Sequence, residues 1–149
     1  MASAFSTHSS LTSSRSAIVG TTRGIPDGPE PEVMAASTLD GNDVVNHSGE
    51  DLGSIKEIMI DVPSGRVAYA VLSSGGLLGI GDKLFAIPWA ALTLDVERKC
   101  FILDINAERL KAAPGFDKDH WPSMADSAWA SDVHAYYGQR NYWLADDDV

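Results

Sequence analysis

The stretch Leu52–Leu72 constrains the fold more than any other part of this sequence. Apolar residues recur at period two on both sides of a central interruption, Pro63–Arg66, and this spacing is typical of β-strands. Pro63 fixes φ, and Gly65 can adopt a positive φ without steric cost, so the interruption can reverse the chain. We therefore predict a β-hairpin whose turn is Pro63–Arg66.

The apolar alternation changes phase within the first half of this hairpin. Ile58 and Ile60 share one parity, whereas Ile55 has the other. The change predicts either a β-bulge near Lys56–Glu57 or burial on both faces of the strand. Helical spacing fits part of the same pattern, but the flanking turns and the β-branched residues favour a strand.

Other short stretches show the same strand signals between turn residues. They are Val33–Ser37, Asp43–His47, Lys83–Trp89, Ala91–Glu97 and Cys100–Ile105. Short strands that are joined by tight turns and close on a small alternating core predict a compact barrel. We predict an all-β fold, namely a small antiparallel β-barrel of about six strands with a short C-terminal helical extension.

The end of the chain differs in composition from the predicted strands. Residues 116–143 hold seven of the twelve aromatic residues. Ser123–Asp126 matches a capping box and Gly138 suits a helix end, so we predict a helix near Ala125–Tyr137. Its apolar stripe consists of Trp129, Val133 and Tyr136. Such a stripe can dock on the barrel of its own chain or on another subunit, and the sequence leaves both open.

The segment Ser73–Asp82 is rich in glycine but lacks the order of a nucleotide-binding loop. A phosphate-binding loop needs Gly-Lys-Ser/Thr after its second glycine, whereas here Gly81 is followed by Asp82. We predict a flexible hairpin connection that can act as a contact loop. Its apolar residues Leu77, Leu78 and Ile80 favour burial against a partner.

Composition excludes several classes of partner. Of 149 residues, 44% are hydrophobic, and the formal net charge of −10 repels nucleic acid and anionic membrane surfaces. No apolar run approaches the roughly 20 residues that cross a bilayer, so we predict no direct membrane insertion. The acid-free, Ser/Thr-rich first 23 residues favour a disordered arm; organelle import is the minority alternative to a cytoplasmic location.

The sequence also lacks the spacing of common catalytic and metal sites. The four histidines form no HExxH or HxH pattern, no GxSxG nucleophile motif occurs, and Cys100 is the single cysteine. In its apolar run Cys100 is interpreted as a small buried residue. We therefore predict a protein that is not an enzyme and that has no cofactor and no metal.

Two runs carry a family resemblance: VVNHSGEDLGSIKEIMIDVPSGRVAYAVLSSGG and, after it, KLFAIPWAALTLD. They contain Gly-Glu-x-Leu-Gly-x-Ile-x-x-Ile-x-Ile-Asp, a turn ending in Gly-Arg-Val, and Phe-x-Ile-Pro-Trp. This set resembles the PRC-barrel family over Val33–Phe116. The expected organisation is a disordered arm with a Pro/Gly linker at 1–31, a PRC-type barrel at 32–115, and an aromatic C-terminal extension with one helix at 116–149.

The resemblance implies a barrel that works by protein contact, as in a stand-alone bacterial member of the family. We expect a homo-oligomer, with a dimer as the first assignment, and a possible further protein partner. The alternatives that the family implies are an accessory of a membrane or photosynthetic electron-transfer complex, like the reaction-centre H subunit, and a ribosome-assembly factor that binds a ribosomal protein. The interface candidates are Leu77, Leu78, Ile80, Trp121, Trp129, Val133, Tyr136, Tyr137, Tyr142 and Trp143.

Overall fold

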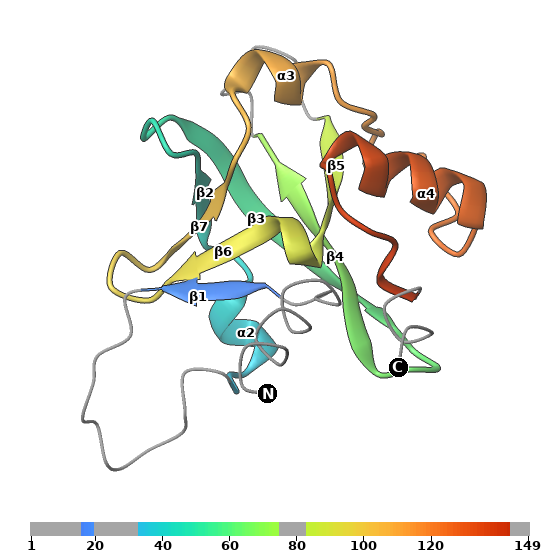
Figure 1. Cartoon of the computed structure of the whole chain (residues 1–149), viewed down its shortest axis with the longest axis horizontal. Helices are drawn as coiled ribbons and strands as arrows, with labels where there is room; N and C mark the ends of the chain where they lie inside the picture. The colour runs from blue at the N-terminus through green and yellow to red at the C-terminus, as the bar shows by residue number, and fades with distance from the viewer. Residues whose placement is uncertain (1–15, 20–32, 75–82, 144–149) are drawn as a thin grey trace, which may run out of the picture.

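The computed structural model of the protein describes residues 16–19, 33–74 and 83–143. In this part of the chain seven strands form one sheet, in the order β1-β6-β7-β2-β3-β4-β5 (Figure 1). The strands are β1 (Ala17–Val19), β2 (Asp43–Val45), β3 (Asp51–Asp61), β4 (Arg66–Ser73), β5 (Leu84–Pro88), β6 (Leu92–Asp95) and β7 (Cys100–Leu103). The helical elements are α2 (Ala36–Leu39), the 3₁₀ turn η1 (Trp89–Ala91), α3 (Ala107–Lys111) and α4 (Ser127–Tyr136).

The predicted all-β, barrel-like fold with a C-terminal helix is confirmed, with three differences in detail. The described strands number seven rather than about six, and no ladder joins β1 to β5 to close the sheet within the described ranges. The sheet is also mixed, because β1 pairs with β6 and β2 with β7 in parallel. Both parallel pairs join strands far apart in the sequence, where a long connection can return the chain in the same direction.

The predicted hairpin is confirmed as β3 and β4. The two strands pair antiparallel, and the Gly65 amide donates to the Asp61 carbonyl oxygen over 2.8 Å with a φ of +75° at Gly65. The register shifts between Ile55 and Glu57, which confirms the bulge expected near Lys56–Glu57. Since a bulge bends a strand and increases its twist, it helps β3 to wrap around a small core.

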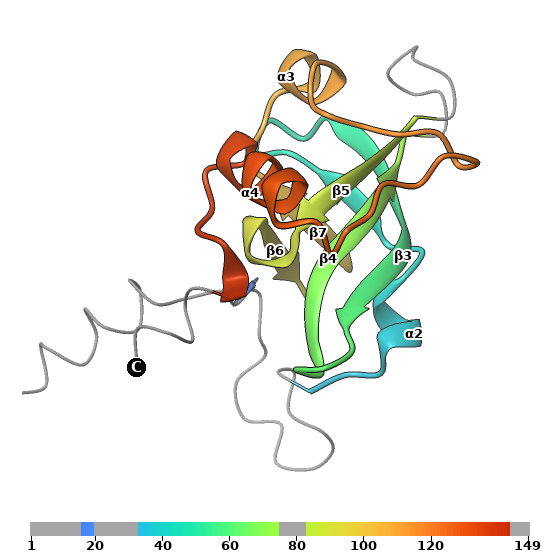
Figure 2. The same cartoon turned by 90° about the vertical axis from the view of Figure 1, so that its right-hand side faces the viewer.

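The barrel core lies on the inner face of this curved sheet. Phe85, Ile87 and Phe101 are at most 1% exposed there, together with other side chains from β2 to β7 and Leu110 of α3. A second cluster lies on the outer side of the sheet, between β4, β5 and α4. Figure 2 shows α4 lying across β5 on that side.

The predicted C-terminal helix is confirmed, and it lies on the barrel of its own chain. Its N-cap is Asp126, whose carboxylate accepts from the Ala128 amide over 2.9 Å, rather than Ser123 of the predicted capping box. The end of α4 has paired Gly138–Ala135 and Gln139–His134 backbone bonds, the pattern of a Schellman cap.

Two short elements differ from the sequence-based expectation. The strand predicted at Val33–Ser37 is wrong, because α2 begins at Ala36 and consecutive alanines favour a helical turn over a strand. Residues 17–19, within the predicted disordered arm, form β1 alongside β6. The rest of that arm lies outside the described residues.

Candidate functional site

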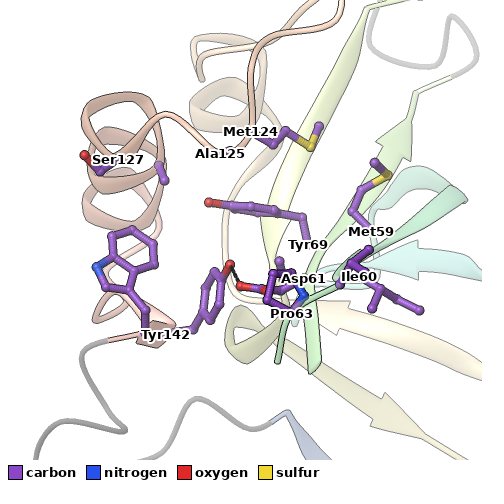
Figure 3. A pocket seen from close by; sticks show the side chains of 13 residues that line it. Met59, Ile60, Asp61, Pro63, Tyr69, Met124, Ala125, Ser127 and Tyr142 are labelled. Atoms are coloured by element: carbon purple, nitrogen blue, oxygen red, sulfur yellow. Dashed lines mark hydrogen bonds between the residues drawn. The ribbon is translucent and has the colours of Figure 1, made fainter. Parts of the chain in front are cut away.

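The described chain has a groove of about 550 Å³, which we call the hairpin groove. One side is formed by the β3–β4 hairpin, with residues 59–63, Ala68 and Tyr69. The other side is formed by residues before, within and after α4, which are Met124, Ala125, Ser127, Ala130, Tyr142 and Trp143. Figure 3 shows these two groups of side chains facing one another across the groove.

The rim on the hairpin side is apolar and exposed. Ile60 is 52% exposed and Val62 is 82% exposed, and the neighbouring Pro63 is also exposed. The hairpin extends beyond the barrel (Figure 1), so the residues near its turn have no core to pack against. Adjacent exposed apolar side chains at a turn are unusual, because turns favour polar residues.

Polar contacts attach the opposite side of the groove to the hairpin. The Tyr142 hydroxyl donates to the Asp61 carboxylate over 2.6 Å, and the Arg66 guanidinium donates to the Tyr142 carbonyl oxygen over 3.0 Å. The same guanidinium lies 5.4 Å from the centre of the Tyr142 ring. The hydrogen bond from Tyr142 lowers the pKa of Asp61, whereas burial and the Asp61 contact raise the pKa of Tyr142 to about 12.

The floor of the groove is Tyr69, a β4 residue that is 1% exposed. Its ring extends from β4 toward α4 (Figure 3) and meets the rings of Trp129 and His134 edge-on, at 5.5 and 5.4 Å between centres. Its hydroxyl is buried and has no hydrogen-bond partner in the part of the chain that the structure describes. Burial raises the pKa of this phenol above its usual value, so the hydroxyl remains protonated at neutral pH.

Behind Tyr69 lies His134, the buried histidine of α4. Its Nδ1 is 2.7 Å from the Ala130 carbonyl oxygen, so in the neutral ring Nδ1 carries the proton and donates it. The ring lies 5.8 Å from that of Tyr142 and 5.6 Å from that of Trp143. Burial lowers the pKa of His134 below its usual value, which favours the neutral form inside this aromatic cluster.

The predicted interface residues fall into separate groups. Leu77, Leu78 and Ile80 lie outside the described residues. Tyr142 and Trp143 line the hairpin groove. Trp121 is exposed and packs against Phe116, with 5.0 Å between ring centres.

The remaining interface candidates contact their own chain. Val133 is buried, and Trp129 and Tyr137 are partly buried against the same cluster. The Tyr136 hydroxyl donates to the Arg109 carbonyl oxygen over 2.6 Å, and so ties α4 to α3. Of the two docking modes left open by the sequence, the structure therefore shows α4 on its own barrel.

Sequence reasoning did not identify Tyr69 or His134 as site residues. The sequence places Tyr69 in the second arm of the predicted hairpin and His134 in the predicted C-terminal helix, and neither position by itself indicates a site. The sequence predicts the strand that holds Tyr69 and the helix that holds His134. The contact between their rings depends on how α4 packs on the barrel. The one available signal was the concentration of aromatic residues after residue 115, which indicated an aromatic contact without its location.

The groove offers contact chemistry more than reactive chemistry. Within the described ranges no three His, Cys, Asp or Glu side chains gather as metal ligands. No helix in that part of the chain combines the length and the apolar character needed to span a membrane. What remains is an apolar, aromatic cleft with one buried, unpaired hydroxyl at its floor.

A known protein family matches the part of the chain that contains β2 to β7. A family model described as the PRC-barrel domain matches residues 31–110, which is more than half of the chain. None of the curated proteins compared with the chain matches it in sequence. The hairpin side of the groove lies inside the matched region, whereas the side from Met124 to Trp143 lies beyond it. The groove thus combines a family element with a further C-terminal segment.

Proposed function

The chain belongs to the PRC-barrel family, and from this premise we propose that it is a non-catalytic interaction module that self-associates through the rim of the hairpin groove. The PRC-barrel domain is a general protein-interaction module, and its family is generally non-catalytic. The proposal for this chain adds the contact surface and the partner, a second copy of the same chain.

A single observation supports this surface most strongly. Ile60 and Val62, 52% and 82% exposed, stand next to a groove that is lined by Tyr142 and Trp143. Exposed apolar residues beside tyrosine and tryptophan are the composition of energetically important interface positions. Leaving them in water costs free energy that burial against a partner would recover.

The arrangement of rim and groove favours a symmetric dimer. A two-fold interface uses the same patch on both subunits, so the patch must be complementary to itself. Here the exposed turn of the hairpin, with Val62 and Pro63, adjoins the concave surface that these two residues also line. A two-fold axis through this patch would place each turn against the groove rim of the other copy.

Sedimentation velocity of the full chain tests the proposal. We expect a concentration-dependent dimer, and we expect Val62→Asp to weaken dimerisation by about tenfold or more because an unpaired charge would be buried in the contact. Val62 is exposed at a turn, so its substitution leaves the barrel core intact.

Val33→Asp is the matched control, since Val33 is 73% exposed, lies outside the groove lining and gains the same charge. We expect this variant to dimerise like the unmodified chain. A full chain that stays monomeric over the whole concentration range overturns self-association. Equal weakening by both substitutions would instead overturn the assignment of the surface, because it would reflect net charge alone.

A further inference from the structure

We infer that the floor of the hairpin groove is a binding site for a neutral, mainly apolar small molecule with one hydrogen-bond acceptor, which takes the hydrogen bond of the Tyr69 hydroxyl. This inference goes beyond self-association, because the proposed dimer contact uses the exposed rim and the ligand would lie below it. The argument depends on the size of the groove, its lining, and the buried Tyr69 hydroxyl, which has no hydrogen-bond partner among the described residues.

The dimensions and lining suit a small organic molecule. A volume of about 550 Å³ lies within the range of roughly 300–1,000 Å³ that is usual for such sites. Met59 comes from the hairpin side and Met124 from the opposite side (Figure 3), and the small side chains of Ala68 and Ala130 also line the groove. Methionine side chains adapt to irregular apolar shapes and make favourable contacts with aromatic rings.

The Tyr69 hydroxyl gives this apolar site a specific polar contact. Buried polar groups are almost always hydrogen-bonded, and the nearby hydroxyls of Tyr142 and Tyr136 each donate over 2.6 Å. The Tyr69 hydroxyl is more deeply buried than these two, yet it has no hydrogen-bond partner among the described residues, and its ring points into the groove (Figure 3). A ligand oxygen that reached it would satisfy the one donor that the fold leaves unpaired at this floor.

The charges at the groove select a neutral ligand. Asp61 is the single charged residue in the lining, and its carboxylate already accepts from the Tyr142 hydroxyl and the Ser64 amide. A ligand anion would be repelled by this carboxylate. A ligand cation would compete for the Asp61 carboxylate with the Tyr142 hydroxyl and the Ser64 amide, and an unpaired charge in an apolar site is strongly unfavourable.

Titration with prodan, a neutral naphthalene ketone whose emission reports both polarity and hydrogen bonding to its carbonyl, tests the site. We expect saturable binding to the full chain with emission at shorter wavelength than in water. We expect Tyr69→Phe to weaken binding by about fivefold to tenfold and to move the bound emission further to short wavelength, because the carbonyl loses its donor.

Tyr137→Phe is the matched control, since Tyr137 also has a buried, unpaired hydroxyl but does not line the groove. We expect it to bind prodan like the unmodified chain. Absence of saturable binding overturns the site, and so does binding with equal affinity and emission by the Tyr69→Phe variant. Repeating the titration with the unmodified chain, at concentrations where sedimentation velocity finds only monomer, separates this result from self-association, because binding at the floor requires one copy of the chain.

Discussion

At the scale of single residues, Gly53 is the described glycine at which an added Cβ would meet the closest contact. Its φ is +132°, and a Cβ placed there would overlap the carbonyl oxygen of Ser73 on the paired strand. Gly53→Ala therefore combines backbone strain with a steric conflict that flexible side chains cannot relieve. We expect the free energy of unfolding to fall by about 2–4 kcal/mol in urea titrations.

Gly65→Ala provides the comparison for this effect. Gly65 also has a positive φ, +75°, but no other atom lies within 4 Å of the added Cβ. We expect a loss of only about 1 kcal/mol, from backbone strain alone. Equal losses of stability for the two variants would show that the close contact between residue 53 and the Ser73 carbonyl oxygen adds no destabilisation.

At the scale of secondary structure, strong local signals gave the elements that the structure confirms. The turn at Pro63–Arg66 and the terminator Gly138 act within a few residues, so the hairpin and α4 were predictable within narrow bounds. β1 has three residues and depends on distant contacts, such as the Val96 amide donating to the Val19 carbonyl oxygen. The hairpin groove was not predictable either, because it joins residues 59–69 to residues 124–143.

Two side-chain hydrogen bonds attach the segment after α4 to the hairpin. Tyr142→Phe removes the hydroxyl that donates to Asp61, while the Arg66 contact to the Tyr142 carbonyl oxygen remains. We expect the segment to open more often, so that trypsin cleaves after Arg140 about threefold to tenfold faster. Mass spectrometry of early digestion products measures this rate.

Tyr136→Phe is the control for that experiment. It removes a hydroxyl hydrogen bond of the same length. This bond joins α4 to Arg109 of α3 and does not hold the segment that follows α4. We expect cleavage after Arg140 to be unchanged in this variant. Similar acceleration in both variants would mean that α4 detaches as a whole, and that the Tyr142 bond has no separate role.

At the scale of the whole molecule, His134 makes stability depend on pH in the mildly acidic range. Burial lowers its pKa in the folded state below the usual 6.5, so the unfolded chain binds the proton more readily. Its contribution is therefore complete above pH 6.5 and is lost as the pH falls through the folded-state pKa. We expect the melting temperature to decrease between pH 7 and pH 5, as followed by circular dichroism.

His134→Phe keeps an aromatic ring in the cluster and removes the titration. We expect the decrease between pH 7 and pH 5 to become shallower in this variant, whereas an unchanged slope would contradict the role of His134.

For Tyr142 the dependence of stability on pH has the opposite sign, because its pKa rises from 10 to about 12. Its contribution is complete below pH 10 and is lost between pH 10 and pH 12.

The parallel pairing of β2 with β7 has a consequence for the order in which the chain assembles. β3, β4 and β5 pair with strands next to them in the sequence, but residues 43–45 pair with residues 100–102. During synthesis, one edge of β2 therefore remains unpaired until β7 has emerged from the ribosome. Since pairing between distant strands is slow, we expect the closing of this seam to be the late step of folding. The hairpin that dominates the sequence would then form first, as the template on which the rest of the sheet is completed.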